Sequence, residues 1–402
     1  MTVRTVDVLV VGAGPAGLAA ATRLAAAGAG RVEVVEREQQ AGGIPRHCCH
    51  GGFGLRDLQR PLSGPEYARR LVHGAVRSGA RLRTGVTVTG WAGPRTLETV
   101  GPAGPETVSA RAVVLATGAR ERSRSARLVP GTRPAGVLTT GELQQAVHLH
   151  DQWVGSRAVV VGAEPVAFSA VRTLRASGAE TVAMVTEQPR TRVPSLRRPV
   201  PLLARTHIVE LLGRRRLTGV RLRHEDGRTT TLGCDTIVFT GDWIPDHELA
   251  RRGGIALDAG TRGPAVDTAF RTAEPGVFAA GNLLHGGERA GIAAEEGSAA
   301  AEDVLRHIAG EPWPGPGLPV RVDAPLLWAV PNIVRPHGPR PVRFVLRPST
   351  PLAPPRVLVS QDGRVLHRQQ LLMPARPGRP LHLRAGRLDG LDPEGGPVLI
   401  SL

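Results

Sequence analysis

Four residues that can transfer protons, bind metals or act as nucleophiles stand next to one another at His47, Cys48, Cys49 and His50, here called the His-Cys run. Histidine titrates near neutral pH and is therefore suited to accept a proton from a reacting group. Consecutive side chains cannot all converge on one tetrahedral ion, so we expect no metal site. Cys48 is either a small packing residue or a reactive thiolate, and a disulfide with its neighbour would need a strained ring.

Three glycines lie between an apolar strand and an alanine-rich helix, at Gly12, Gly14 and Gly17. The first permits a tight turn out of the strand, the second lets the backbone approach a pyrophosphate, and the third lets the helix pack closely on the strand. The positive end of the helix then faces the phosphates. Glu36 ends the next apolar strand, where a carboxylate accepts hydrogen bonds from an adenosine ribose. Residues 7–36 therefore predict a complete dinucleotide-binding unit.

A second stretch with the same plan covers residues 157–187. Its apolar strand leads into Gly162, but Glu164 stands where the middle glycine is needed and brings a carboxylate towards the phosphates. We therefore expect this unit to bind NAD(P) poorly and to serve as a scaffold or as a docking face for a partner. If a nicotinamide cofactor does bind, Glu187 at the end of the next strand favours NAD over NADP.

The first fold resumes at residues 276–282, so the second nucleotide-type fold is inserted in it. Beyond residue 310, proline-broken segments rich in β-branched residues, with Asp362-Gly363 as a hairpin signal, predict a small β-rich appendage. The predicted fold class is α/β with two Rossmann-like domains and this appendage. The expected segments are 1–150 and 263–310 for the first dinucleotide-binding domain, 151–262 for the second, and 311–402 for the appendage.

The composition excludes several classes of protein. All 51 basic residues are arginine, and they are spread along the chain without one dense block, so the net charge of +16 indicates biased composition. Aromatic residues make up only 3% of the chain, which disfavours a nucleic-acid-binding surface. No apolar run approaches the ~20 residues of a membrane span, and the chain begins directly with a strand. We therefore expect a cytoplasmic protein.

The order of these segments, GAGPAG followed by Glu36, then ATGAR, a second nucleotide-type unit and GVFAAGN, resembles the FAD-dependent pyridine nucleotide–disulfide oxidoreductase superfamily. The resemblance covers residues 5–309. Within the superfamily, the loop GGIPRHCCHGGFGL is similar to a subgroup that includes proteins associated with glycerol-3-phosphate dehydrogenase. That subgroup is related to the FAD subunits of opine, hydroxyproline and sarcosine oxidising enzymes.

The resemblance implies an FAD cofactor and a role for each matching residue. The three glycines of the first turn hold the pyrophosphate and Glu36 the adenosine ribose, while Thr117 and Gly118 line the adenine side. Gly281 and Asn282 approach the ribityl and phosphate oxygens, although the superfamily more often has aspartate at the latter position. The expected cofactor-binding residues are Gly12, Gly14, Gly17, Glu36, Gly42, Gly43, Thr117, Gly118, Gly281 and Asn282.

The resemblance also implies that the His-Cys run passes close to the isoalloxazine. Disulfide reductases of this superfamily have two cysteines separated by four residues, so adjacent cysteines argue against dithiol reduction. His47 or His50 then serves as a base or orients a polar substrate, or both merely hydrogen-bond the loop or flavin. Cys48 is a packing residue or a thiolate near the flavin. The candidate catalytic residues are therefore His47, His50 and Cys48.

Three functions remain open on these grounds. The first is a dehydrogenase or oxidase that transfers a hydride from a small amine, amino acid or hydroxy acid to FAD and passes electrons to a quinone, oxygen or a partner subunit. The second is an NAD(P)H-dependent reductase that passes electrons through FAD to a protein acceptor. The third is a non-catalytic FAD-binding subunit of a larger dehydrogenase complex.

Overall fold

The computed structural model describes residues 2–189, 200–336, 338 and 341–402 and divides into two compact units. The first unit comprises Met1–Arg46, Gly51–Ala119 and Pro245–Leu402. The second unit comprises His47–His50 and Arg120–Ile244. The His-Cys run therefore belongs to the second unit, although the chain on both sides of it belongs to the first.

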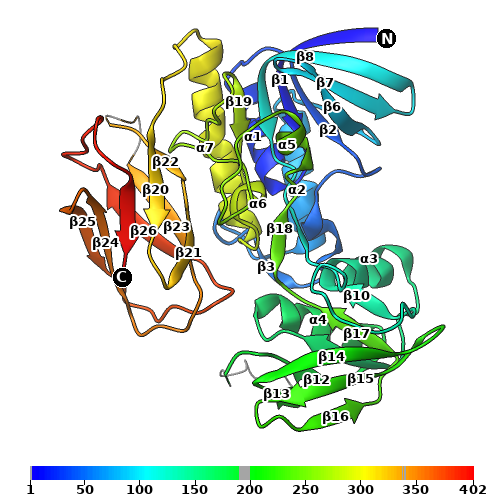
Figure 1. The fold of residues 1–402 in the computed structure, drawn as a ribbon. Helices are drawn as coiled ribbons and strands as arrows, with labels where there is room; N and C mark the ends of the chain where they lie inside the picture. Colours follow the sequence, from blue (N-terminus) through cyan, green and yellow to red (C-terminus); the bar gives the residue numbers. More distant parts are fainter. Residues whose placement is uncertain (1, 190–199, 337, 339–340) are drawn as a thin grey trace. The chain divides into compact units, whose positions relative to one another are not determined.

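The first unit is built on a seven-stranded sheet in the order β5-β2-β1-β8-β7-β6, with β19 also pairing with β8 (Figure 1). Five strands are parallel, namely β1 (Thr2–Val11), β2 (Val32–Glu36), β5 (Arg81–Thr84), β8 (Gly104–Leu115) and β19 (Val277–Ala279). The antiparallel strands β6 (Thr87–Gly93) and β7 (Thr96–Gly101) extend it. The strand expected over residues 81–89 is two strands, because the chain turns at Gly85, where φ is 67°.

Three helices complete this nucleotide fold: α1 (Pro15–Ala26), α2 (Gly64–Arg77) and α7 (Ala290–Ile308). Their apolar faces share one core with the parallel strands, including Leu18, Leu24 and Phe278, all fully buried. Helices α1 and α7 pack closely because a Cβ at Gly297 would lie 2.0 Å from the carbonyl oxygen of Ala16. Segments almost three hundred residues apart in the sequence thus meet beside β1.

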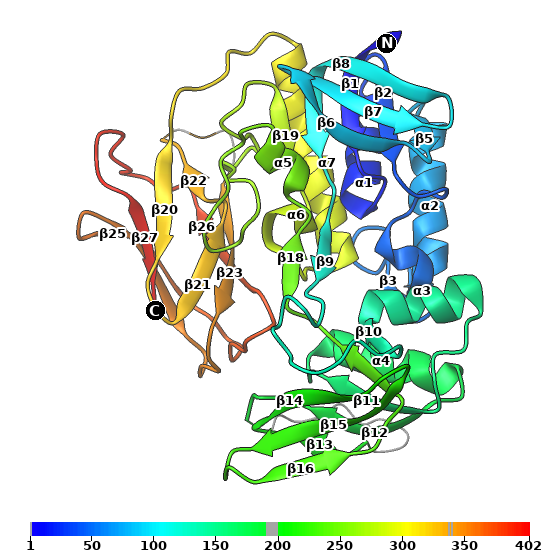
Figure 2. The same ribbon diagram turned by 45° about the vertical axis from the view of Figure 1, so that its right-hand side comes forward.

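The second unit repeats the nucleotide-type plan on a smaller scale (Figure 2). Its parallel sheet has the order β10-β17-β11-β12-β13 and is accompanied by two helices and an antiparallel three-stranded sheet. The parallel sheet and its helices are β10 (Val137–Thr139), α3 (Thr140–His150), β11 (Arg157–Val161), α4 (Pro165–Ala176), β12 (Glu180–Val185), β13 (Leu202–Leu203) and β17 (Thr236–Phe239). The antiparallel sheet comprises β14 (Thr206–Gly213), β15 (Leu217–His224) and β16 (Thr229–Leu232).

Residues beyond 310 form two sheets around their own apolar core, which includes Leu318, Phe344 and Val398. One sheet has the order β22-β20-β27-β24-β25 and the other β21-β23-β26. Their strands are β20 (Leu318–Val322), β21 (Leu326–Val330), β22 (Ile333–Val334), β23 (Val342–Pro348), β24 (Arg356–Gln361), β25 (Arg364–Gln370), β26 (Leu381–Gly386) and β27 (Val398–Ser401). The predicted hairpin at Asp362-Gly363 joins β24 to β25, with positive φ at both residues. The predicted fold class, with two Rossmann-like domains and a β-rich appendage, is confirmed.

The remaining elements are short. They are a 3-10 turn η1 (Ile44–His47), strands β3 (Gly51–Phe53), β4 (Leu62–Ser63), β9 (Ala119–Glu121) and β18 (Trp243–Pro245), and helices α5 (Glu248–Arg252) and α6 (Asn282–His285). Strands β9 and β18 lie at the two points where the chain leaves the first unit for the inserted residues and returns.

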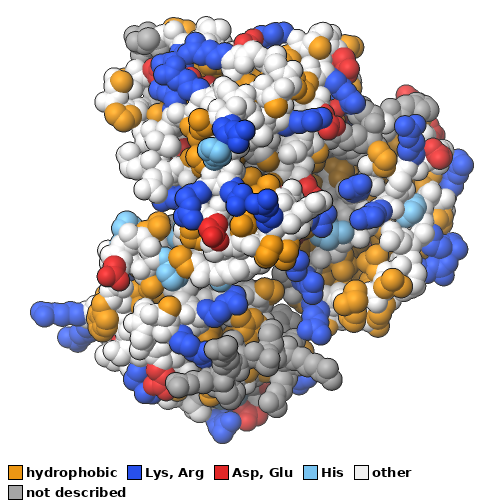
Figure 3. Space-filling view, turned by 180° about the vertical axis from the view of Figure 1, so that it is seen from behind, with side chains coloured by type: hydrophobic (Ala, Val, Ile, Leu, Met, Phe, Trp, Pro, Cys, Tyr) orange, Lys and Arg blue, Asp and Glu red, His pale blue; other side chains and the backbone are white. Residues whose placement is uncertain are grey.

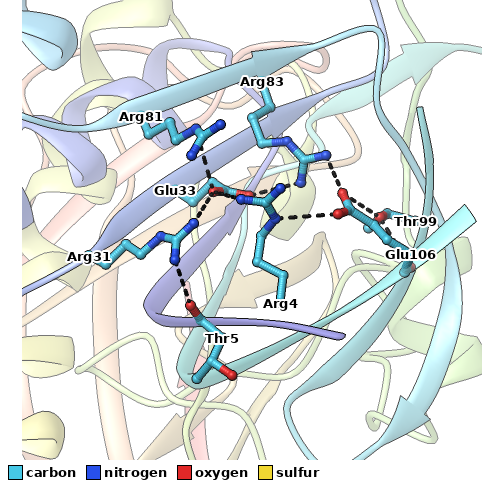
Figure 4. Close-up of polar contacts among 8 residues, drawn as sticks. All are labelled: Arg4, Thr5, Arg31, Glu33, Arg81, Arg83, Thr99 and Glu106. Carbon is cyan, nitrogen blue, oxygen red and sulfur yellow. Dashed lines mark hydrogen bonds and ion pairs between the residues drawn. The ribbon is translucent and has the colours of Figure 1, made fainter. Parts of the chain in front are cut away.

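A fully buried carboxylate, Glu33 of β2, is surrounded by arginines at the edge where the parallel strands begin (Figure 4). Arg83 Nη1 lies 2.9 Å from Glu33 Oε1, and Arg4, Arg31 and Arg81 lie 3.7 to 4.0 Å from Oε2. Arg4 and Arg83 also contact Glu106. This cluster lies at the edge opposite the carboxyl ends of the strands, so we assign it to the stability of the sheet.

The surface shows no dense basic region on the face drawn in Figure 3, where arginines stand at many separate places among apolar and uncharged side chains. This agrees with the scattered arginines of the sequence. Within the described residues, no helix is both long and apolar enough to cross a membrane.

Candidate functional site

The turn between β1 and α1 leaves room for a ligand at one of its three glycines. Gly12 has a φ of 101°, and a Cβ there would lie 2.5 Å from the carbonyl oxygen of Ala116. A Cβ at Gly17 would lie 1.9 Å from the carbonyl oxygen of Gly12. A Cβ at Gly14, in contrast, would meet no atom within 4 Å. Gly12 and Gly17 are therefore needed by the fold itself, whereas Gly14 opens onto free space.

Two further predicted glycine sites converge on this turn. Gly42 donates its N–H to the carbonyl oxygen of Ala13 at 2.8 Å. A Cβ at Gly43 would lie 2.8 Å from the Cα of Gly14, and a Cβ at Gly281 would lie 2.6 Å from the Cβ of Ala16. The structure thus brings together residues that lie more than two hundred positions apart in the chain.

Glu36 is held at the end of β2 beside the same turn. Its Oε2 accepts a hydrogen bond from the N–H of Ala13 at 2.9 Å, and its Oε1 accepts one from the N–H of Glu38 at 3.0 Å. Each carboxylate oxygen has a second lone pair with which to accept a bond from a hydroxyl. The carboxylate is therefore oriented by the backbone before any ligand binds.

The other predicted cofactor residues have protein partners. Thr117 Oγ1 donates to the carbonyl oxygen of Asp246 at 2.8 Å, and Gly118 has a φ of 78° with open space beside it. Asn282 donates through Nδ2 to the carbonyl oxygen of Glu288 and accepts from its N–H through Oδ1, at 3.2 and 3.0 Å. Aspartate cannot make the first of these bonds, which explains an amide at this position.

These residues fit the diphosphate end of FAD. In the described structure, helices α2 and α3 are capped by Ser63 and Thr139, but no side chain caps α1 and its first turn carries no acid. The N–H groups at the start of α1 therefore remain available for a phosphate, next to the open space at Gly14. Glu36 supplies the acceptor for a ribose hydroxyl.

A buried histidine supports the turn at Gly281, and sequence reasoning did not find it. Glu296 of α7 accepts a hydrogen bond from the N–H of Gly281 at 3.1 Å, and His285 Nε2 lies 2.9 Å from Glu296 Oε1. The ring of His285 stacks on Trp328 of the appendage, with a centroid separation of 6.3 Å. Glu296 occurs in an ordinary amphipathic helix pattern, so only the folded chain reveals its role.

The His285 pair predicts a pH-dependent stability. Burial lowers the pKa of His285 and Arg347 opposes its charge, but the carboxylates of Glu296 and Glu288 raise the pKa above its ordinary value. A raised pKa in the folded state stabilises the fold below the unfolded pKa of about 6.5, and this contribution is lost as the pH rises through the folded value. Urea unfolding midpoints measured across this range should therefore fall with rising pH.

His285→Gln should flatten that dependence, whereas the same change at the exposed His73 should leave it intact. An unchanged slope in the His285 variant would show that the histidine does not carry a proton in the folded protein.

The His-Cys run is anchored within the second unit. Cys48 is buried, and its Sγ lies 3.4 Å from Oε1 of Gln144 in α3, whose Nε2 donates to Ser169 of α4 at 2.9 Å. His47 is buried and His50 is half-buried. Burial and the charge of His50 lower the pKa of His148 in α3. Gln144 and Ser169 were not predicted from the sequence, because single polar residues in helices carry no distinctive signal.

The two adjacent cysteines should differ in reactivity. Burial, together with the nearby Cys49 and Glu121, raises the pKa of Cys48 to about 12, and burial raises that of Cys234 to about 12. Cys49 is exposed, and all three thiols are free. Iodoacetamide at pH 8 should therefore modify Cys49 in the native protein and all three cysteines only after unfolding, as measured by mass spectrometry. Rapid native labelling of Cys48 would show that it is a reactive thiolate.

The chain was compared with known proteins at the level of family, sequence and structure. The family model described as pyridine nucleotide-disulphide oxidoreductase matches residues 6–297. The alpha chain of sarcosine oxidase from Rhizobium meliloti (strain 1021) is 28% identical over 361 residues, which cover 81% of this chain and 34% of that protein. An opine oxidase subunit of Agrobacterium tumefaciens (strain Ach5) is 29% identical over 322 residues, which cover 69% and 61%.

The thioredoxin reductase of T. acidophilum shares the fold, with a TM-score of 0.60 and 24% identity, over 75% of this chain and 98% of that one. The chain thus spans less than two thirds of the length of the two curated relatives. Because the family model covers well over half of the chain, the resemblance inferred from the sequence is confirmed. The chain belongs to the pyridine nucleotide–disulphide oxidoreductase family of FAD-dependent oxidoreductases.

Proposed function

We propose that this chain is an FAD-dependent dehydrogenase or oxidase that takes a hydride from a small amine, amino acid or hydroxy acid. The observation that carries the proposal is an open FAD cradle at Gly14 combined with a loop that offers a histidine but no redox dithiol. The names of the sarcosine and opine oxidase relatives support an N-substituted amino acid as the substrate class.

The proposed FAD domain consists of residues 1–150 and 263–310, followed by the appendage at 311–402. Within it we assign the pyrophosphate to Gly12, Gly14 and Gly17, and the ribose to Glu36. Gly42 and Gly43 support this turn, Thr117 and Gly118 lie on the adenine side, and Gly281 and Asn282 on the ribityl side. The inserted residues 151–262 form the second nucleotide-type domain.

Bound FAD supplies a two-electron acceptor for the hydride. The amine or hydroxyl next to the reacting carbon must lose a proton, and an imine or carbonyl forms as the C–H bond breaks. We assign the proton acceptor to a ring nitrogen of His50, because its side chain is half-buried, whereas that of His47 is buried and holds the loop. Cys48 packs against Gln144 and keeps its proton, because burial raises its pKa.

We further propose that the chain works as part of a larger, multi-chain enzyme, because the sarcosine and opine oxidase relatives are themselves named as subunits. The electrons would leave to a quinone, to oxygen or to a partner subunit. Co-expression with candidate partner chains, followed by purification through a tag on this chain, tests this point.

Anaerobic rapid mixing tests the reaction. The purified flavoprotein is mixed with N-substituted amino acids, amino acids, amines and hydroxy acids, and separately with NADH, while flavin absorbance is followed. Bleaching by a member of the first set supports the proposal, and His50→Gln should slow that bleaching about 100-fold and alter its pH profile. His73→Gln, at an exposed histidine of α2, is the control.

Rapid bleaching by NADH alone would favour a nicotinamide-dependent reductase instead. A yellow protein that no compound bleaches, even with its partner chains present, would identify a non-catalytic FAD-binding subunit. Full bleaching by substrate with unchanged rates in His50→Gln would remove the proposed base while leaving the reaction class intact.

A further inference from the structure

The two nucleotide-type folds of this chain can be aligned by equivalent hydrogen bonds. Gly12 donates to the carbonyl oxygen of Val35 at 2.8 Å, and Gly162 donates to that of Val185 at 2.8 Å. Ala116 donates to Val11 at 2.9 Å, and Thr240 donates to Val161 at 3.0 Å. Position 164 of the second fold therefore corresponds to position 14 of the first. The same alignment makes residue 186 the counterpart of residue 36.

The space that is open in the first fold is filled in the second. The Glu164 carboxylate folds back over its own turn, where Oε2 accepts from the N–H of Ala163 at 2.9 Å and Oε1 accepts from Thr240 Oγ1 at 2.5 Å. A Cβ at Gly162 would lie 2.7 Å from this carboxylate, and one at Gly241 would lie 2.6 Å from it. The side chain thus occupies the place between β11 and β17 where a pyrophosphate would approach the backbone.

The ribose acceptor is missing as well. The residue equivalent to Glu36 is Thr186, whose Oγ1 accepts from the N–H of Gln188 at 3.3 Å. Glu187, which the sequence suggested for this role, lies one residue later and is exposed. That expectation was wrong because β12 ends at Val185, two residues earlier than Glu187. The alanine N–H that is bound by the ribose acid in the first fold is bound by Glu164 in the second.

A second carboxylate strengthens the negative charge at this turn. Glu121 is buried and accepts hydrogen bonds from the N–H groups of Gly141 and Gly241, at 2.9 and 3.1 Å. Arg127 donates to the carbonyl oxygens of Thr240 and Gly241 and interacts electrostatically with both Glu121 and Glu164. This arginine is therefore already balanced by protein carboxylates, and a diphosphate would meet uncompensated repulsion.

We propose that Glu164 is a built-in occupant of the pyrophosphate position in the second fold, so that this fold excludes NAD(H) and NADP(H). The domain keeps the architecture of a nicotinamide-binding domain but uses it for another purpose. In the described structure its helices α3 and α4 hold the His-Cys run through Gln144 and Ser169. Electrons then enter from the organic substrate and not from a nicotinamide bound in this fold.

Replacement of one side chain should open the site. We compare NADH, NADPH and ADP binding to the wild-type holoprotein, Glu164→Gly and the double variant Glu164→Gly/Thr186→Glu, by calorimetry and thermal shift. Glu164→Gly should bind NADH at least about 100-fold more tightly than the wild type, since an unpaired carboxylate is removed from the phosphate position. The double variant should gain further affinity for NADH through a ribose contact.

Two matched variants test the physical cause. Glu164→Gln keeps the bulk of the side chain and should gain at most a few-fold, while Glu225→Gln removes a charge at an exposed site of the same unit and should gain nothing. Retained flavin absorbance and an unchanged unfolding midpoint show that each variant is folded. The proposal is overturned if the wild type already binds NADH as tightly as Glu164→Gly, or if both folded glycine variants fail to bind. These readouts do not depend on turnover, so they stand apart from the proposed reaction.

Discussion

A Gly14→Glu variant of this chain is expected to fold normally and to contain almost no FAD. Gly14 has φ and ψ of −82° and −175°, which any residue adopts, and a Cβ there meets no protein atom within 4 Å. The added carboxylate would enter the pyrophosphate space and reproduce in the first fold the arrangement that Glu164 creates in the second. FAD affinity should fall about 100-fold or more. Flavin content after purification and titration of the apoprotein with FAD measure the effect.

Two other glycines make this result specific. Gly315→Glu adds the same charge at an exposed, open glycine of the same unit and should leave the FAD content unchanged. Gly17→Ala places a methyl group 1.9 Å from the carbonyl oxygen of Gly12 and should reduce stability as well as FAD content. A folded Gly14→Glu variant with stoichiometric FAD would show that the diphosphate does not lie at this turn.

Arg83→Met should destabilise the first unit by about 3–5 kcal/mol, because it leaves a buried carboxylate without its only close partner in the described cluster. Arg83 Nη1 lies 2.9 Å from Glu33, whose side chain is completely buried. The other arginines remain at 3.7 Å or more and are more exposed than Arg83. The midpoint of urea unfolding, followed in parallel by circular dichroism and flavin fluorescence, measures the loss.

The double variant Arg83→Met/Glu33→Leu separates pairing from packing. Removing both charges should restore much of the lost stability, since hydrophobic replacements of a buried pair are often neutral or better. Arg157→Ala breaks an exposed ion pair with Glu180 and should cost less than about 1 kcal/mol. If Arg83→Met cost no more than this surface change, the arginine cluster would not stabilise the sheet.

The sequence predicted the cofactor fold because its determinants are local. The turn at Gly12, the helix that begins at Pro15 and the carboxylate that ends β2 lie within thirty residues and obey backbone geometry that permits few alternatives. The inserted repeat and its defective glycine position were visible for the same reason. The extension of the sheet by β6 and β7 was not predicted, because short antiparallel strands resemble the surrounding loops.

Contacts between distant residues were decided only by the tertiary structure. The support of Gly281 by Glu296 and His285, the anchoring of Cys48 by Gln144, and the pairing of Glu33 with Arg83 join residues whose separation in sequence leaves no periodic signal. The register of β12 likewise made Thr186, and not Glu187, the counterpart of Glu36. Local backbone rules therefore determined which cofactor fold the chain contains, whereas long-range packing determined which of its side chains fill, support or leave open each nucleotide turn.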